Sequence, residues 1–318
     1  MYKIGIMGLG HIAGVMADSI KKLPDHKVTA VASRSLAKAE DFALKHCKSA
    51  MTFGSYEELV REDLDLIYIA TPNHCHYGNA LLAIRAGHNV LVEKPFAMNS
   101  EETAEVFREA VGRGVLVCEA MWTCFMPIHR TMLGWIEEGK IGKVKYISSN
   151  LGYDIEHTRR LTDPTMGGGS YPDLGVYTTN LAMSILGEDL IATSCYARRI
   201  NSGVEKDVFY TLENQDRSSV AASYVTMCAA TDKDGSIVGT NGRIRLVNIN
   251  NYERAVLYDK EGRILEEVVR DDSKPNGYAL EVKACTRAIS AGRRQTDEMP
   301  WSRTTALMKM QDTLKSMM

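Results

Sequence analysis

A glycine-rich turn near the N-terminus constrains the fold of this chain more than any other feature. The segment Gly8-Leu9-Gly10-His11-Ile12-Ala13 matches the pattern G-x-G-x-x-[G/A]. It follows the apolar run Lys3–Met7 and opens a helical pattern over residues 11–22. In such a strand–turn–helix unit, the first glycine permits a tight turn and the second lets a diphosphate approach the backbone. The anion would then sit on the helix N-terminus. The alternative is a turn that binds nothing, and the strand and helix on either side disfavour it.

The first 120 residues alternate short apolar runs with helical patterns, which predicts a doubly wound parallel sheet. The expected strands are Lys3–Met7, Val28–Ala32, Asp65–Ala70, Asn89–Val92 and Val115–Cys118. The expected helices are 11–22, Leu36–His46, 55–61, 74–86 and Ser100–Gly112, with Ser100 as the N-cap.

The pattern changes after residue 120. Helices are expected at 127–138 and 171–186 and a strand at 143–151, followed by a series of alternating segments between 190 and 270 that predicts an antiparallel sheet. Helices at 277–291 and 302–316 close the chain, the second with Ser302 as a candidate cap. We therefore expect an α/β protein with an N-terminal Rossmann domain over 1–120. An α+β substrate-binding and dimerisation domain follows over 121–318, and its last helix is a candidate to pack back on the first domain.

Composition excludes several classes of protein. Of the 318 residues, 45% are hydrophobic and 25% are charged, which is typical of a globular protein. The net charge of −2 disfavours nucleic acid as a partner, and no apolar run reaches the ~20 residues of a membrane span. Seven scattered cysteines without a C-x-x-C pair indicate reduced thiols in a cytoplasmic protein.

The end of the second strand bears on the choice of dinucleotide. An acidic residue there usually binds the ribose hydroxyls of NAD, but this chain has Ser33 and Arg34 and no carboxylate. Arg34 offers a planar fork to a 2′-phosphate, and Lys38 lies one helical turn further on. Both could instead be solvated surface charges. We favour NADP, with NAD still possible.

Two loops follow later strands, at the edge where ligands of open α/β sheets bind. One contains Thr71, Pro72, Asn73 and His76, and the other contains Glu93 and Lys94. Lys94 is either a cationic group of the active site or a surface lysine. The cluster His74-Cys75-His76 has no distant ligand set, so we expect no metal.

A third group of residues lies at 167–177, where three glycines precede Ser170-Tyr171-Pro172-Asp173. Asp173 and Tyr177 are four residues apart and share a helix face. They could line a pocket. Equally, Asp173 could cap the helix while Tyr177 packs in the core.

In this order, the motifs resemble those of the glucose–fructose oxidoreductase/inositol dehydrogenase/rhizopine-catabolism (Gfo/Idh/MocA) family over essentially the whole chain. The ordered set is G-x-G-x-x-A, T-P-N-x-x-H at 71–76, E-K-P at 93–95 and G-G-G-x-x-x-D-x-x-x-Y. Within the family, the chain is most similar to dimeric dihydrodiol dehydrogenases and NADP-linked aldose dehydrogenases. The segments that carry this likeness are GSYEELV at 54–60, EAMW at 119–122 and Tyr177.

The resemblance implies roles for individual residues. Tyr177 would be the acid/base, Lys94 would contact cofactor and substrate, and Asp173 would orient the substrate or the surroundings of Tyr177. Trp122 would form a wall of the substrate pocket, and a cis bond is expected before Pro95. Cys124 departs from the family, whose closest members have arginine in W-x-R-F. If that arginine binds the substrate or braces the pocket in those members, we expect the substrate of this chain to differ from theirs.

The expected reaction moves a hydride between nicotinamide and the hydroxyl-bearing carbon of a small polyol, sugar or dihydrodiol. A free tyrosine, with a pKa near ~10, is a poor base at neutral pH. A nearby lysine ammonium favours the phenolate and lowers that pKa. A large apolar sheet face needs a cover, so we also expect a homodimer or homotetramer through the C-terminal sheet.

Two alternative functions would each be recognised by a different feature. A dinucleotide-sensing regulatory protein would be expected to lose Lys94 or Tyr177, and both are present. A redox-neutral epimerase or lyase would hold a cofactor that never exchanges.

Overall fold

A computed structural model describes all residues from Met1 to Met318. Contacts divide the chain into two compact units. The first unit contains Met1–Trp122 and Asp272–Thr304, and the second contains Thr123–Asp271 and Thr305–Met318. The expected division had placed all of 121–318 in one domain, so it did not anticipate that Asp272–Thr304 belongs to the first unit.

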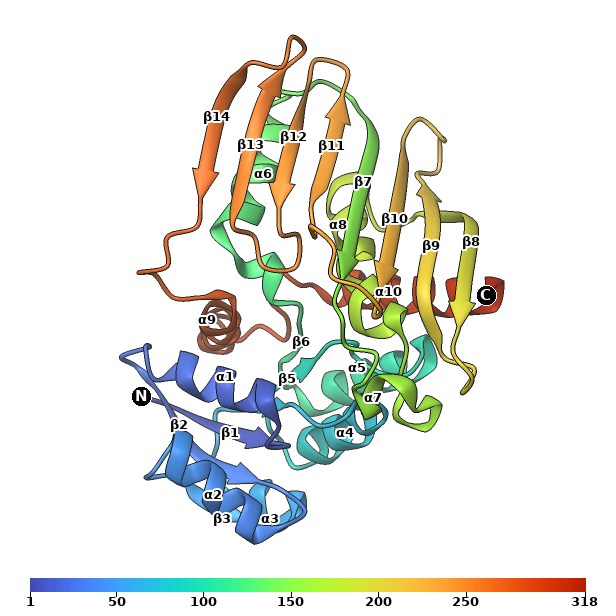
Figure 1. The fold of residues 1–318 in the computed structure, drawn as a ribbon. Coiled ribbons are helices and arrows are strands. Elements are labelled where there is room, and N and C mark those ends of the chain that lie inside the picture. The colour runs from blue at the N-terminus through green and yellow to red at the C-terminus, as the bar shows by residue number, and fades with distance from the viewer. The chain divides into compact units, whose positions relative to one another are not determined.

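The first unit is built on a six-stranded sheet in the order β3-β2-β1-β4-β5-β6, and every neighbouring pair is parallel (Figure 1). Its strands are β1 (Tyr2–Met7), β2 (His26–Ala32), β3 (Met51–Phe53), β4 (Leu66–Ile69), β5 (Val90–Glu93) and β6 (Val117–Ala120). All residues of β4, β5 and β6 are buried, as expected for strands covered on both faces. The predicted doubly wound parallel sheet is confirmed.

Among the helices of the first unit, α1 packs against α9 and α2, and α4 packs against α5. They are α1 (His11–Ile20), α2 (Leu36–His46), α3 (Tyr56–Leu59), α4 (His76–Arg85), α5 (Ser100–Arg113) and α9 (Gly277–Ser290). Helix α10 (Trp301–Met317) runs from the first unit into the second. None of the helices combines the length and the apolarity that crossing a membrane requires.

Two predicted helix caps are wrong. The N-cap of α5 is Asn99, whose side chain accepts a hydrogen bond of 2.9 Å from the N–H of Glu102. Ser100 is therefore the first residue inside the helix. Ser302 also lies inside its helix, because α10 begins at Trp301. Both errors are within the uncertainty of helix ends read from local patterns.

The second unit contains an eight-stranded sheet in the order β14-β13-β12-β11-β7-β10-β9-β8. Neighbouring strands are antiparallel except β7 and β10, so the expected mainly antiparallel sheet is confirmed. Its strands are β7 (Val144–Gly152), β8 (Ile191–Arg199), β9 (Glu205–Glu213), β10 (Val220–Thr226), β11 (Gly235–Gly239), β12 (Gly242–Val247), β13 (Arg254–Asp259) and β14 (Ile264–Val269).

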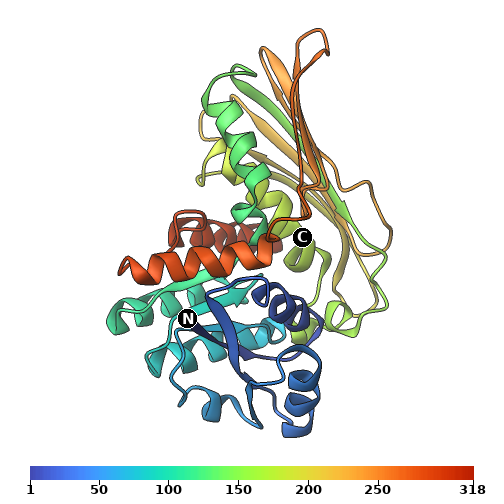
Figure 2. The same ribbon diagram turned by 90° about the vertical axis from the view of Figure 1, so that its left-hand side faces the viewer.

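Helices cover only one face of this sheet. Figures 1 and 2 show α6 (Pro127–Glu137) and α8 (Val176–Leu186) against that face and no helix of the second unit on the other. Short helical segments connect the elements: α7 (Arg159–Thr162), 3₁₀ turns at Trp122–Phe125 and Pro164–Met166, and a π-helical turn at Tyr171–Gly175.

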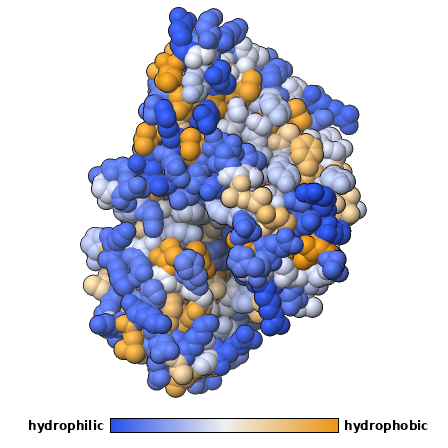
Figure 3. Space-filling model, in the orientation of Figure 1, coloured by the Kyte–Doolittle hydropathy of each residue, from blue (hydrophilic) through white to orange (hydrophobic).

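The uncovered face, which we call the open sheet face, carries exposed aromatic side chains. Tyr196 is 66% exposed and Phe209 is 44% exposed. The register aligns Tyr196 with Phe209 and Phe209 with Tyr224, so these rings form a row across β8, β9 and β10. Figure 3, viewed from this side, shows hydrophobic residues interspersed with hydrophilic ones over the sheet.

The turn after β1 depends on Gly8. Its φ is +84°, and a Cβ at this position would lie 2.8 Å from the backbone carbonyl of Ala70 at the end of the neighbouring strand. Both the dihedral angle and the contact exclude a side chain. Gly10, two residues later, has φ −89°, and a Cβ there would meet nothing within 4 Å.

We therefore expect Gly8→Ala to destabilise the protein by about 1–3 kcal/mol, which lowers Tm by on the order of 5 °C. Gly10→Ala is the matched control and should leave Tm within about 1 °C of the wild type. Thermal unfolding followed by circular dichroism measures both. Equal Tm values for the two variants would show that the turn is not strained in this way.

Candidate functional site

The turn between β1 and α1 fits an anionic ligand. Helix α1 begins after Gly10, which gives its first turn no side-chain cap, and no acidic side chain lies in that turn. The N–H groups at this end therefore have no competing acceptor from a cap, and the helix dipole favours a negative charge. His11 is exposed, Ile12 is half-buried, and the space beside Gly10 is open. These features suit the diphosphate of a dinucleotide.

The end of β2 presents two cations to solvent. Ser33 is buried, whereas Arg34 and Lys38 are exposed and form no salt bridge within the chain. The hydroxyl of Ser35 caps α2 by accepting from the N–H of Lys38. A phosphate bound at the start of α2 would therefore lie near the positive charges of Arg34 and Lys38, which no salt bridge within the chain neutralises, and near no carboxylate of this segment.

His76 joins the two loops that the sequence singled out. It is 1% exposed, with Nδ1 lying 2.9 Å from the carbonyl oxygen of Pro95 and Nε2 lying 2.8 Å from that of Thr71. Burial lowers the pKa of His76, and a neutral imidazole donates from only one nitrogen at a time. The side chain of Asn79 adds a hydrogen bond of 3.0 Å to the Thr71 hydroxyl. His76 thus fixes the spacing of the loops after β4 and β5.

The segment Glu93-Lys94-Pro95 lies at the end of β5, and the carboxylate of Glu93 points into the protein. Glu93 is 8% exposed and accepts a hydrogen bond from the hydroxyl of Tyr68. Lys94 is half-buried, and the Lys94–Pro95 peptide bond is cis, as expected. The N–H of Phe96 donates to Glu119 Oε1 at 3.2 Å. The Lys94 loop is therefore tied to the sheet on both sides of the lysine.

Glu119 adds a second titratable group beside this loop. It is 2% exposed on β6, and burial raises its pKa to about 7, against the hydrogen bond from Phe96 and the nearby charge of Lys94. A perturbed carboxyl group next to a candidate lysine is typical of functional sites.

Asp173 is held by an arginine that the sequence did not reveal. It is 5% exposed and lies in the π-helical turn, where Arg160 Nη1 donates to Oδ1 at 2.9 Å and Nη2 donates to Oδ2 at 3.3 Å. Such a fork fixes the plane of the carboxylate. The sequence predicted one continuous α-helix over 171–186. The structure instead has a π-helical turn before α8, and π turns are rare and frequent at functional sites.

Tyr177 and Trp122 are both largely enclosed. Tyr177 lies in the first turn of α8 and is 6% exposed. Trp122 is 8% exposed and stacks on Tyr278 of α9, with ring centroids 4.3 Å apart and an interplanar angle of 21°. The sequence predicted Trp122 alone as the aromatic wall of the pocket, and the structure adds Tyr278 as a second aromatic ring beside it.

Within each unit, the structure brings most of the predicted residues together. In the first, the dinucleotide turn and the loops of Thr71–His76 and Glu93–Lys94 follow β1, β4 and β5, which are parallel neighbours. In the second, Asp173 and Tyr177 lie on one helical segment. Sequence reasoning missed a further set of residues around them: Tyr68, Glu119, Arg160 and Tyr278. Of these four, only Glu119 could have been singled out from the sequence, because it is a charged residue in an otherwise apolar strand.

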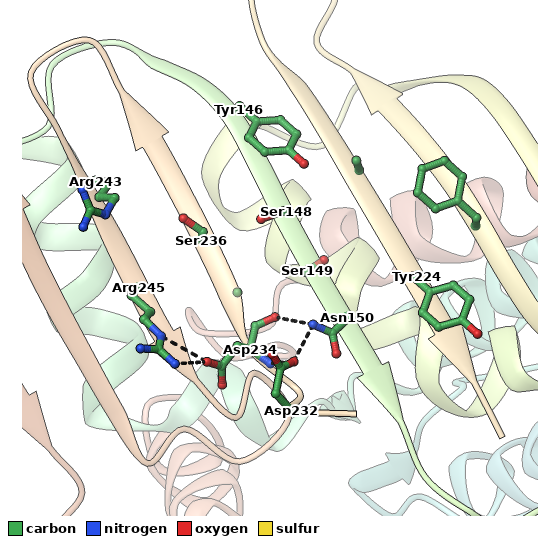
Figure 4. Close-up of a pocket in the computed structure, with 13 residues that line it drawn as sticks. Tyr146, Ser148, Ser149, Asn150, Tyr224, Asp232, Asp234, Ser236, Arg243 and Arg245 are labelled. Atoms are coloured by element: carbon green, nitrogen blue, oxygen red, sulfur yellow. Dashed lines mark hydrogen bonds and ion pairs between the residues drawn. The ribbon is translucent and has the colours of Figure 1, made fainter. Parts of the chain in front are cut away.

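A shallow hollow of about 450 Å³ lies on the open sheet face (Figure 4). Its side chains come from β7 and the strands around it, and Arg245 pairs with Asp234 at 2.8 Å while Asn150 donates to Asp232 at 2.7 Å. It contains none of the predicted cofactor or substrate residues. No group of three or more His, Cys, Asp or Glu side chains is arranged to hold a metal ion.

Two family models match consecutive parts of the chain. Residues 2–121 match the GFO_IDH_MocA oxidoreductase family with an NAD-binding Rossmann fold, and residues 129–245 match the GFO/IDH/MocA C-terminal domain.

Similar proteins include dehydrogenases and reductases. A trans-1,2-dihydrobenzene-1,2-diol dehydrogenase of Macaca fuscata fuscata is 32% identical over 305 residues, which cover 93% of this chain and 90% of the relative. The Bos taurus enzyme of the same name is 33% identical over 249 residues, covering 77% and 73%.

Two solved structures share the fold. One is a 3-ketoreductase from Actinomadura kijaniata in complex with NADP and TDP-benzene (TM-score 0.88, 22% identity, 99% of this chain and 97% of that one). The other is an aldose-aldose oxidoreductase from Caulobacter crescentus complexed with glycerol (TM-score 0.88, 18% identity, 99% and 97%).

Proposed function

The chain belongs to the Gfo/Idh/MocA family of NAD(P)-dependent oxidoreductases, and we propose that it transfers a hydride between NADP and a hydroxyl-bearing carbon. The substrate class is a small polyol, sugar or dihydrodiol, which agrees with the diol and sugar chemistry that its relatives' names state. The observation that carries the proposal is the common edge of β1, β4 and β5, where the uncapped helix end and the Lys94 loop both lie.

NADP is the proposed cofactor because residues 33–38, directly after β2, include two exposed cations and no carboxylate. The backbone at Gly8, Gly10, His11 and Ile12 would hold the diphosphate, and Arg34 and Lys38 would bind the 2′-phosphate. Ser33, Thr71, Pro72, Asn73, His76 and Glu93 complete the proposed cofactor site. His76 and Glu93 act there by fixing the loops, since both are buried.

Tyr177 is the proposed acid/base. A dinucleotide held at the turn of Gly8 and Gly10 would supply the hydride chemistry at the hydroxyl-bearing carbon of the substrate. Tyr177 takes the hydroxyl proton as the alcohol is oxidised and gives it back in reduction. The ammonium of Lys94 favours the phenolate, so that Tyr177 can act as a base near neutral pH.

Asp173 is the proposed orienting group, with Trp122 as an apolar wall. The fork of hydrogen bonds from Arg160 holds the carboxylate of Asp173 in one plane. An ionised carboxylate accepts hydrogen bonds from substrate hydroxyl groups, whereas the Trp122–Tyr278 stack offers a flat apolar surface to a sugar or diol ring.

A second copy of the chain is the proposed partner of the open sheet face. The row Tyr196, Phe209, Tyr224 exposes aromatic surface that a protein normally covers, and the paired charges of Asp234 and Arg245 lie beside it. The proposed assembly is a homodimer or homotetramer through this face.

The reaction is tested first by a screen of aldoses, inositols, trans-dihydrodiols and dicarbonyls with NAD and NADP, following the absorbance of the reduced nicotinamide. With the best substrate, Tyr177→Phe and Lys94→Ala should each lower kcat by about 10²–10⁴-fold, while NADPH affinity largely persists. Tyr171→Phe is the matched control, because the Tyr171 hydroxyl is fully buried and bonds to Thr179 at 3.0 Å. Undiminished turnover in Tyr177→Phe would reject the assignment.

Arg34→Ala should weaken NADP binding by about 10- to 100-fold, since a charge-assisted contact to the 2′-phosphate is lost. The affinity for NAD should change less than about threefold. Isothermal titration of both dinucleotides measures this difference, with Lys48→Ala as a control for removing an exposed positive charge. Equal losses for NAD and NADP would mean that Arg34 does not read the 2′-phosphate.

Sedimentation should give the wild type a mass that is a multiple of the 35.3 kDa chain. Phe209→Asp should shift the protein towards the single-chain mass, because a carboxylate would be buried without a partner in the interface. Leu44→Asp, at a 64% exposed position on α2, is the control and should leave the mass unchanged. A wild type that sediments as one chain at micromolar concentration would contradict the proposed assembly.

A further inference from the structure

A carboxyl group without a partner lies inside the first unit. Glu281 of α9 is 0% exposed, and neither of its carboxyl oxygens has a hydrogen-bond partner. Burying an ionised carboxylate in this way costs several kcal/mol, so such a group normally takes up a proton. Most of the inward positions on α9 are apolar or small, which makes this glutamate an exception on its own helix.

The acidic neighbour of Glu281 is Glu93, the residue before Lys94. The register pairs Leu91 of β5 with Tyr68 of β4 and with Cys118 of β6. Side chains alternate along a strand, so Glu93, two residues after Leu91, points to the same face of the sheet as Tyr68 and Cys118. Helix α9 lies on that face, where Cys285 interacts with Cys118 and Glu281 faces Glu93.

Only one of the two carboxyl groups can be ionised without a large cost, because like charges in a dry interior oppose each other. The negative charge costs less on Glu93, because Glu93 accepts the hydrogen bond from Tyr68 whereas neither carboxyl oxygen of Glu281 has a partner. Glu281 is the neutral member. Burial, followed by the charge of Glu93 and the thiol of Cys118, raises the pKa of Glu281 well above its ordinary value.

We propose that Glu281 is a positioning residue for the Lys94 loop: it stays protonated at neutral pH, which leaves Glu93 as the single anion on this face, and its ionisation sets the upper pH limit of the activity. This inference rests on the proposed role of Lys94. The groups that face Glu281 are Glu93 from β5, Tyr68 from β4, Cys118 from β6 and Cys285 from its own helix.

The sign of the pH effect follows from proton binding. In the unfolded chain, glutamate ionises near pH ~4.3, whereas folded Glu281 keeps its proton to higher pH. The folded state therefore binds more protons between these two values, and the stability of the protein falls as pH rises through that window. At the upper end, a second negative charge enters the space beside Glu93 and disturbs the carboxylate that anchors the Lys94 loop.

The test compares Glu281→Gln with the wild type, because glutamine has nearly the same shape and cannot ionise. The Tm of the variant should match the wild type at pH 4, below the ordinary pKa of glutamate, and exceed it by on the order of 5 °C at pH 9. The alkaline midpoint of kcat should move up by ~1 pH unit or more, with kcat at pH 7 within about twofold of the wild type. Glu40→Gln, at an exposed position on α2, is the matched control and should change neither profile.

Two further measurements need no substrate. NADPH affinity across the same pH range should show the same alkaline shift in Glu281→Gln. The infrared C=O band of a protonated carboxyl should be present in the wild type at pH 7 and reduced in the variant. Absence of that difference would overturn the proposal, and so would a wild-type Tm advantage at pH 9. Repeated at pH 9, where Glu119 with its pKa of about 7 is ionised, the infrared measurement on the wild type tests the proposal even if the variant folds poorly.

The failure of this inference can be told apart from failure of the proposed function. If Lys94→Ala abolishes turnover but the alkaline limits of kcat and NADPH affinity are the same in Glu281→Gln and the wild type, the positioning role is wrong and the hydride-transfer proposal stands. If no substrate gives turnover, hydride transfer fails, and the pH dependence of NADPH affinity still decides the role of Glu281.

Discussion

The parallel direction of β1, β4 and β5 is the constraint on which the rest of the first unit depends. Strands that run the same way end at the same edge of the sheet, so the loops that follow them meet there. His76 then sets the distance between two of these loops by contacting a carbonyl oxygen of each. The position of the Lys94 loop therefore depends on a buried imidazole and on the direction of the strands.

Local patterns predicted the elements whose formation depends on local chemistry. Helix α2 lies at the predicted residues Leu36–His46, because Ser35 supplies a cap and the apolar positions recur on one face. The strands of both sheets, apart from β3, were predicted for the same reason, since alternation and apolar runs are read directly from the chain. Strand β3 was missed because three partly exposed residues, Met51–Phe53, give no such pattern.

The parts of the site that the sequence did not predict are contacts between residues that lie far apart in the chain. The residues around Arg160 give no sequence signal that its guanidinium binds Asp173. The contact depends on the loop between them, which folds back through glycine turns such as Gly169, with φ +134°. Likewise, Glu281 meets Glu93 across 188 positions of sequence only because α9 belongs to the first unit. A glutamate in an amphipathic helix is ordinarily placed on the solvent side. Its burial is decided by tertiary packing, which sequence periodicity does not report.

Cys124, the departure from the family pattern, is enclosed beside the helix that carries Tyr177. Its side chain is buried, and the amide of Asn180 lies 3.1 Å from its sulfur. Asn180 is three residues after Tyr177 on α8, so the two side chains are neighbours on the helix surface. An arginine at position 124 would bring a positive charge and a much longer side chain into this enclosed space. The small thiol instead fits beside the amide of Asn180, which lies one turn from Tyr177 on α8.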